Sequence, residues 1–200
     1  DARMSDLDSS AIETFRKVWM EKRGNKQIAN LSQEQLLRDC EAVNRKGEIT
    51  YAALILFGTH EALGEFLGNA ETVFEYRGNE ASGPAGQRKD FREGLFCYFD
   101  QLWELINLRN LKLPYQEGFF VYDVYAYNER AVREAVLNAV CHRNYQLPGS
   151  VFVKQYPDRI VFDSPGGFIG DITPENVLDR QSVRNRRLAE ILGRCGLVER

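Results

Sequence analysis

The sequence predicts an α+β fold in which helices cover one face of a mixed sheet, preceded by a mostly helical module. Residues 128–145 contain no Gly or Pro and are rich in Ala, Leu, Glu and Arg, which indicates a helix. Residues 150–163 hold two β-rich runs around Pro157-Asp158, which indicates a β-hairpin directly after that helix. The first part of the chain, in contrast, shows apolar residues at helical spacing.

Composition limits the classes of protein to consider. The chain has 200 residues, 44% of them hydrophobic, which is enough for one large domain or two small ones. A net charge of −3 argues against a dominant nucleic-acid surface. The four cysteines are far apart and form no C-x-x-C motif, so we expect reduced thiols in a cytoplasmic protein. No signal peptide and no apolar run of about 20 residues is present, so we expect no membrane association.

Residues 1–60 are expected to form a helical connecting module, and residues 61–200 the α/β domain. In the module, a first helix should start after Asp8 and end near Gly24, and a second should start at Ser32 and end near Val43. The wholly apolar run 51–57 predicts a short buried helix capped by Thr50. A winged-helix-like bundle is an alternative, although no Arg/Lys-rich recognition helix is present. The acidic start and the final Gly-Leu-Val-Glu-Arg resemble cut points in a longer protein.

The predicted elements of the α/β domain follow in chain order. They are a strand at 71–77, a Gly-rich loop at 78–86, a helix at 91–108, a β-rich run at 119–127, the helix and hairpin above, a helix starting at Thr173-Pro174, and a last helix at 188–194. We expect the helices at 128–143 and 174–180 on one face of the sheet, with the hairpin central in it.

Glu134, Asn138 and His142 lie four residues apart and so share a stripe about 80° wide on one face of the 128–145 helix. Their angular neighbours are small or apolar: Ala131, Ala135, Leu137 and Cys141. Such flanks favour a polar row that faces a cleft. A glutamate can orient or deprotonate a water, and an asparagine oxygen can bind Mg²⁺. Alternatively, Glu134 and Asn138 cap neighbouring loops or pair with an arginine.

Two further segments could contact a ligand. Asp163 ends a predicted strand and is followed by Gly166 and Gly167, which would let the backbone approach a ligand closely. A Pro-Gly turn without a ligand explains the same residues. The basic run 184–187 could hold phosphate, or it could be a solvated basic turn.

Together these motifs resemble a known family. They are Arg-Glu-Ala-Val-Leu-Asn-Ala-Val-Cys-His-Arg-Asn-Tyr (133–145), Asp-Arg-Ile (158–160), Ser-Pro-Gly-Gly-Phe (164–168), Thr-Pro-Glu-Asn (173–176), Arg-Asn (184–185) and Gly-Leu-Val-Glu (196–199). Residues 120–200 resemble the C-terminal domain of RecG-related ATP-dependent DNA helicases, a family also described as transcriptional regulators. That domain is a relative of the GHKL ATPase fold of gyrase B, Hsp90 chaperones and histidine kinases. Residues 31–37 and 49–58 resemble, more weakly, the segment that follows an AlbA-like (Schlafen-type) domain in such proteins.

The resemblance implies a GHKL-like α/β sandwich with ATP and Mg²⁺ as cofactors. Glu134 would be the general base and Asn138 the Mg²⁺ ligand. His142 and Arg143 match a His-Arg pair of this subgroup, which we assign to the nucleotide site without a defined role. Asp163, Gly166 and Gly167 match the glycine box, whose Asp would accept a hydrogen bond from the adenine amino group.

The sequence also departs from the GHKL pattern. Asp163-Ser-Pro-Gly-Gly replaces D-x-G-x-G, the glycine-rich lid would follow Glu199, and no Walker A motif supports a helicase. We therefore expect an ATP-binding regulatory domain of a DNA-associated protein, in which residues 1–200 alone bind ATP weakly or not at all and do not hydrolyse it measurably. DNA would bind through other domains, and a homo-oligomer is left open. The alternative is a non-enzymatic scaffold or oligomerisation domain with a degenerate nucleotide site.

Overall fold

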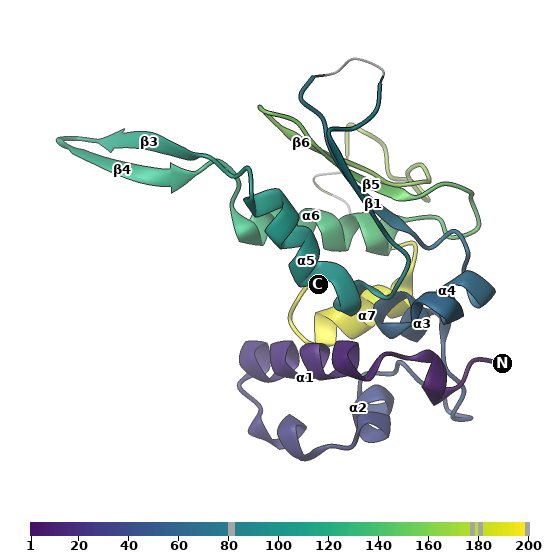
Figure 1. Cartoon of the computed structure of the whole chain (residues 1–200). Coiled ribbons are helices and arrows are strands. Elements are labelled where there is room, and N and C mark those ends of the chain that lie inside the picture. The colour runs from purple at the N-terminus through teal and green to yellow at the C-terminus, as the bar shows by residue number, and fades with distance from the viewer. Residues whose placement is uncertain (80–82, 177–178, 180–181, 199–200) are drawn as a thin grey trace.

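The structure is a computed structural model that describes residues 1–79, 83–176, 179 and 182–198. Its N-terminal part is helical (Figure 1). The helices are α1 (Ser9–Arg23), α2 (Gln33–Asp39), α3 (Tyr51–Phe57) and α4 (His60–Phe66), with short 3₁₀ turns at Met4–Asp6 and Lys26–Asn30. The predicted caps are confirmed. The side chains of Asp8, Ser32 and Thr50 each accept a hydrogen bond from the backbone N–H of the residue three positions later. The second helix ends earlier than predicted, and α4 was not predicted.

The main sheet is mixed, as predicted. Its strands are β1 (Thr72–Tyr76), β2 (Gln87–Phe91), β5 (Val151–Gln155) and β6 (Ile160–Asp163), in the order β2-β1-β5-β6. β1 and β5 are parallel and the other neighbours are antiparallel. The predicted hairpin 150–163 is confirmed, with β5 inside the sheet and β6 at its edge. β2 was missed because its run Gln-Arg-Lys-Asp-Phe has no β-branched residue.

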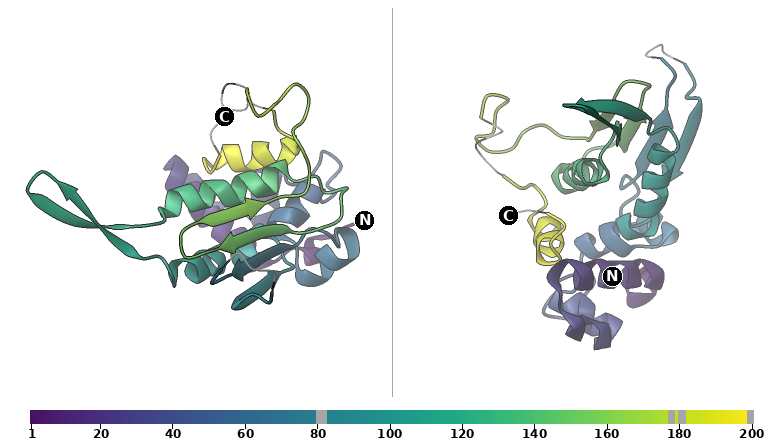
Figure 2. Two further views of the ribbon diagram at one scale, coloured as in Figure 1. Left: turned by 90° about the horizontal axis from the view of Figure 1, so that it is seen from above. Right: turned by 90° about the vertical axis from the view of Figure 1, so that its left-hand side faces the viewer.

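Helices α5 (Leu95–Asn107) and α6 (Glu129–His142) cover one face of this sheet (Figure 2). Along β5 the side chains of Val151, Val153 and Gln155 are buried toward that face, with the period of two expected of a strand. Asn128 is the N-cap of α6, and its side chain accepts hydrogen bonds from the backbone N–H groups of Arg130 and Ala131. The cap therefore fixes where the predicted helix begins.

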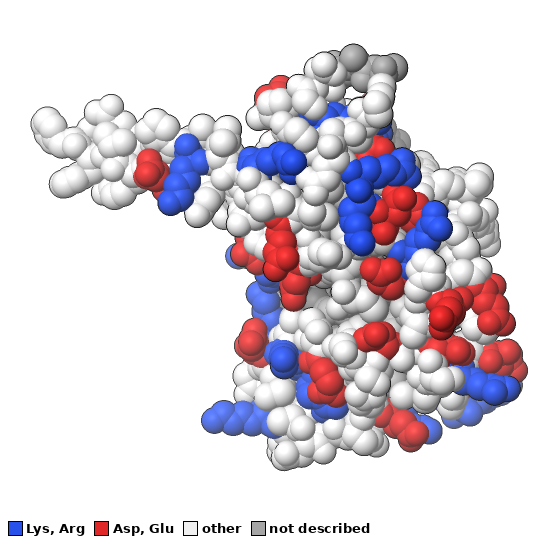
Figure 3. Space-filling view, in the orientation of Figure 1, with Lys and Arg blue, Asp and Glu red and all other residues white. Residues whose placement is uncertain are grey.

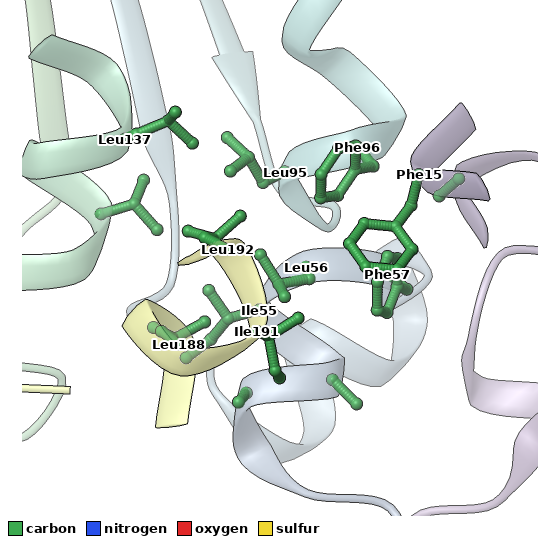
Figure 4. Packing of buried hydrophobic residues seen from close by; sticks show 14 of the residues in the cluster. Phe15, Ile55, Leu56, Phe57, Leu95, Phe96, Leu137, Leu188, Ile191 and Leu192 are labelled. Carbon is green, nitrogen blue, oxygen red and sulfur yellow. The ribbon is translucent and has the colours of Figure 1, made fainter. Parts of the chain in front are cut away.

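One continuous hydrophobic cluster joins the N-terminal helices to the α/β part. Helix α7 (Arg186–Arg194) inserts Leu188, Ile191 and Leu192 between α6 and α3 (Figure 4). In the same cluster, the Phe15 ring of α1 lies 5.2 Å from the rings of both Phe57 and Phe96. The domain boundary at residue 60 stays a prediction, and this cluster crosses it.

The remaining strands, β3 (Lys112–Glu117) and β4 (Phe120–Tyr125), form a separate two-stranded sheet. This hairpin projects from the body (Figure 1). The β-rich run predicted at 119–127 is thus a strand, but it pairs with β3 and not with the main sheet. We call residues 111–126 the arm.

The helix predicted to start at Thr173-Pro174 is not seen where the chain is described. Residues 174–176 form a turn, and residues 177–178 and 180 of the expected helix lie outside the described residues. The Asn176 side chain accepts from the Thr173 N–H at 2.8 Å and donates to the Asp171 carbonyl at 2.8 Å. Such local side-chain bonds compete with helical ones. Within the described ranges, no helix is long and apolar enough to cross a membrane.

Candidate nucleotide site

A cavity of about 830 Å³ lies along the outer side of α6. We call it the α6 cavity. Its walls are α6, the loop segments 164–172 and 182–184, residues 196–198, and Lys22 of α1. Segments that are distant in the sequence therefore meet at one place. The volume falls in the range of a small-molecule site.

Glu134, Asn138 and His142 all line the α6 cavity. The opposite stripe of the helix, with Val132 and Val136, is buried in the core. The row thus faces a cleft, as its small flanking residues suggest. The side chains of Glu134, Asn138 and His142 form no hydrogen bond or ion pair with any residue that the structure describes. The alternative that Glu134 and Asn138 cap neighbouring loops or pair with an arginine is therefore not seen among the described residues.

The glycine loop is held against the C-terminal end of α6. The Ser164 hydroxyl donates to the Ala139 carbonyl at 2.8 Å, and the Asn144 N–H donates to the Pro165 carbonyl at 2.7 Å. Gly166 has a φ of +124°, and a Cβ added there would come within 3.1 Å of the Asn144 Cβ. A glycine is therefore needed at this position, and Gly166 and Gly167 both line the α6 cavity.

Arg184 ties the loop to the helix. Its Nε donates to the His142 carbonyl at 3.2 Å and its Nη2 to the Gly167 carbonyl at 2.7 Å. The adjacent Asn185 amide donates to the carbonyls of Cys141 and Arg143, at 2.8 and 2.7 Å, and so satisfies free carbonyls at the helix end. Arg186, which the sequence grouped with Arg184, pairs with Glu190 and does not line the α6 cavity.

The charges around the α6 cavity are mostly positive. Its basic lining residues are Lys22, Arg130, Arg133 and Arg184, whereas Glu134 is the acidic one within the described ranges. Partial burial, and then the nearby charge of Arg184, lower the pKa of His142 from its usual value of 6.5. The imidazole is therefore neutral at neutral pH. An anionic ligand suits this set of charges.

Asp163 does not share the cavity with Glu134 and Asn138, contrary to the prediction. In the sheet register Asp163 lies opposite Phe152, and the Asp163 carboxylate pairs with Lys154 at 2.6 Å. Phe152 and Lys154 alternate with the buried residues of β5, so Asp163 is on the sheet face away from α6. A one-residue shift along a strand reverses the face, and the next residue, Ser164, is the one that reaches α6.

Arg143 is not a cavity residue either. It is buried, with 1% of its surface exposed, and its guanidinium donates to the backbone carbonyls of Asn69 and Gly149. The guanidinium also lies 4.7 Å from the Tyr145 ring centroid. Arg143 therefore joins the two loops that precede the central parallel strands, β1 and β5. It follows His142 directly but is already outside the helix, as the C-cap residue of α6.

Several lining residues were missed by the sequence reasoning. Arg130 precedes Glu134 by four residues, so the same spacing that revealed the row could have revealed it. Ser164 could have been found from its place beside the glycines. Lys22 comes from α1, and nothing in the local sequence connects it to α6.

Comparisons with known proteins agree with the C-terminal resemblance. Residues 149–200 match the family described as "Putative ATP-dependent DNA helicase recG C-terminal". Residues 1–73 match a domain of unknown function, DUF8451. None of the curated proteins matches the chain.

Among solved structures, the crystal structure of the DIP2311 protein from Corynebacterium diphtheriae is similar. The two are 28% identical with a TM-score of 0.81, over 99% of this chain and 38% of that one. The chain thus spans less than half the length of that protein. Residues 149–200 are similar to a RecG-related, ATPase-type domain, and the fold likeness extends over nearly the whole chain.

Proposed function

We propose that the α6 cavity binds Mg·ATP and that the chain is a GHKL-like regulatory domain of a RecG-related, DNA-associated protein. The observation that carries the proposal is the row of Glu134, Asn138 and His142 in a basic cavity, where these side chains have no partner among the described residues. A polar side chain that faces a cavity without a protein partner can bond a ligand without first giving up a bond within the protein. The match of residues 149–200 supports the choice of nucleotide.

The residues present fit Mg²⁺ held jointly by protein and phosphate. In the described ranges, no group of three or more His, Cys, Asp or Glu side chains could hold a metal alone. Mg²⁺ does not need such a cage, because it keeps several waters and binds one or two protein oxygens together with substrate phosphates. The Asn138 amide oxygen would be the protein ligand, and the ion would neutralise phosphate charge.

The basic residues and the glycine loop would hold the phosphates. Arg133 and Arg184 line the α6 cavity beside the row, although both already hold protein partners, Glu129 for Arg133 and two carbonyls for Arg184. Charge-assisted bonds of this type contribute roughly 1.5–3 kcal/mol each. Some of that is offset by the bonds that the arginines would give up. We therefore propose weak binding by this chain.

This chain would recognise the adenine base differently from a GHKL protein, in which an aspartate binds the adenine. Asp163 is on the wrong face of the sheet and is paired with Lys154. Phe168 and Ile169 line the α6 cavity and offer an apolar surface for a base. Glu134 would orient the attacking water, and hydrolysis would be slow, as expected of a switch.

The test is a titration of the chain with Mg·ATP, followed by thermal shift and calorimetry. We expect a Kd between about 0.1 and several mM, loss of the Mg²⁺ dependence in Asn138→Ala, and unchanged binding in Gln101→Ala, an exposed amide on α5. Glu134→Gln should keep binding. No shift in the wild-type protein at about 10 mM Mg·ATP would contradict the proposal.

That negative result would favour the second candidate, a non-enzymatic scaffold with a degenerate site. The specific observation in its favour is the displaced Asp163, which removes the expected adenine contact. A scaffold would show neither Mg²⁺ dependence nor any effect of Asn138→Ala.

A further inference from the structure

Within the described ranges, Lys22 is the part of the α6 cavity wall that α1 contributes. The last turn of α1 is docked on the end of α7, because the Arg23 side chain donates hydrogen bonds to the carbonyls of Gly193 and Arg194, each at 2.7 Å. Gly196 packs beside Lys22, since a Cβ added to this glycine would lie 3.4 Å from the Lys22 Cβ. The backbone at Lys22 is therefore held against the cavity, whereas its long side chain is exposed.

Lys22 lies toward the N-terminal half of α6. Helix α7 begins beside the other end of α6, where the Asn185 amide donates to the Arg143 carbonyl at 2.7 Å, and runs back alongside α6 (Figure 2). Its nine residues span about 13 Å. The end of α7, and with it Lys22, is therefore level with the first turns of α6, from which Arg130 and Arg133 line the same cavity.

The positive charge of the α6 cavity is local. The chain has a net charge of −3, and basic and acidic side chains are intermixed on the face of the molecule shown in Figure 3. Among the described lining residues of the cavity, in contrast, Glu134 is the acidic residue and the basic residues are Lys22, Arg130, Arg133 and Arg184. An anion would therefore be attracted by these side chains and not by the molecule as a whole.

Lys22 differs from the arginines of the cavity because its charge has no protein partner among the described residues. Arg133 pairs with Glu129. Arg184 donates to two backbone carbonyls, and Arg130 has an interaction of its own. The Lys22 ammonium has no hydrogen bond or ion pair with any residue that the structure describes. A phosphate that binds Lys22 therefore breaks no bond to a described residue.

We propose that Lys22 binds phosphate oxygens of the ligand in the α6 cavity, so that the bound ligand bridges α6 and α1. This inference rests on the proposed function, from which it takes the phosphate chain of the ligand. A lysine ammonium suits the task, because it is a compact charge with three donors on a flexible stem. The bond would stabilise the docked position of α1 by as much as that position raises the affinity for the ligand.

The first test compares Lys22→Gln with Lys17→Gln in titrations of the 200-residue chain with Mg·ATP and with magnesium tripolyphosphate. Lys17 is an exposed lysine of the same helix that does not line the cavity, so its loss is a matched change of charge. We expect Lys22→Gln to weaken binding at least about 5-fold and Lys17→Gln to change it less than about 2-fold. Lys22→Arg keeps the charge and should stay within about 3-fold of the wild type. None of these exposed substitutions should change the Tm of the free chain.

Acetylation of the lysines, followed by mass spectrometry, tests for direct contact. N-hydroxysuccinimide acetate should modify both Lys22 and Lys17 in the free chain, because both side chains are exposed. Mg·ATP at about 10 mM should slow the modification of Lys22 at least about 2-fold and leave that of Lys17 unchanged. An electrostatic effect of Lys22 at a distance would change the Kd without this protection.

The outcomes separate this inference from the proposed function. If the wild type binds Mg·ATP but Lys22→Gln binds it equally well, or if Lys22 is not protected, the inference is overturned and the nucleotide function stands. If the wild type binds tripolyphosphate but not Mg·ATP, and Lys22→Gln weakens that binding, the nucleotide function fails and Lys22 is supported as a phosphate-binding residue. A wild type that binds neither compound overturns both.

Discussion

Histidine 142 shows how a single residue of the site depends on its neighbours. Its ring lines the α6 cavity without a hydrogen bond to a described residue. The Arg184 side chain donates a hydrogen bond to the backbone carbonyl of His142. The positive charge beside the ring and the partial burial both disfavour the protonated form. A negatively charged ligand in the cavity would have the opposite effect. The pKa of His142 should therefore change when a charged ligand binds in the cavity.

The pH dependence of stability follows from this lowered pKa. The unfolded chain takes up the proton more readily, so the free energy of unfolding should fall as the pH drops below about 6.5 and level off beneath the folded pKa. His142→Gln should remove this component, and Arg184→Gln should reduce it. Urea unfolding at several pH values between about 5 and 7.5 measures it. Equal pH dependence in the wild type and His142→Gln would contradict the assignment.

At the same scale, the sequence predicted the polar row but not the place of Asp163 or Arg143. The row follows from helical geometry alone, because spacing of four residues defines a face. The face of Asp163 depends on which residues of β5 and β6 pair, and the sequence does not specify that register. The partners of Arg143 are backbone carbonyls of distant loops, which leave no trace in a side-chain pattern.

Packing between elements depends on close backbone approach at the start of α5. The N-cap Gly94 donates its N–H to the Gly58 carbonyl at 2.8 Å, just beyond the end of α3. A Cβ on Gly94 would lie 2.5 Å from the Phe57 nitrogen and 2.6 Å from the Gly58 nitrogen. Both atoms belong to backbone, which cannot rotate away. The helix therefore starts where a residue without a side chain allows it to touch α3.

Gly94→Ala should destabilise the protein by about 2–3 kcal/mol, because α5 must move away from α3. Gly64→Ala is the control. Gly64 is exposed inside α4, no atom lies within 4 Å of its added Cβ, and the change should stabilise by about 0.5–1 kcal/mol. Urea denaturation measures both. A neutral Gly94→Ala would show that the contact between α3 and α5 is loose.

Most of the helices were predictable as elements, whereas the strands β2 and β3 were not. Caps at Thr50 and Asn128 are local signals, and both are confirmed. β2 and β3 carry charged residues and a proline, and they form because β1 and β4 offer them paired edges. Strand formation that depends on a distant partner has little local signature.

Over the whole molecule, α7 links the two predicted units. The α6 cavity also combines both, since Lys22 of α1 lies with α6 and with residues 196–198 near the chain end. Arg23 reinforces this contact by donating to the carbonyls of Arg194 and Gly193, each at 2.7 Å. A ligand at the α6 cavity would therefore act on the N-terminal helices as well as on the sheet. That arrangement is consistent with the regulatory role proposed above.

The core predicts one cooperative unfolding transition for both units. Trp19 in α1 and Trp103 in α5 are the two tryptophans of the chain, and both pack against the shared cluster. Trp103→Phe leaves a probe for the N-terminal helices, and Trp19→Phe leaves a probe for the α/β part. We expect the two variants to give coincident fluorescence and circular-dichroism midpoints. Separate midpoints would show that residues 1–60 fold independently.

Leu192→Ala tests the same link directly, because this leucine is fully buried where α7 meets α3 and α6. The substitution should cost about 2–5 kcal/mol and lower both fluorescence midpoints together. For a domain of this size the expected decrease in Tm is roughly 5–15 °C. Leu147→Ala, at a leucine that is 43% exposed in a loop, should change stability by less than about 0.5 kcal/mol. If Leu192→Ala lowered only the Trp103 signal, the N-terminal helices would not depend on α7, and the cavity could not transmit ligand binding to them through this core.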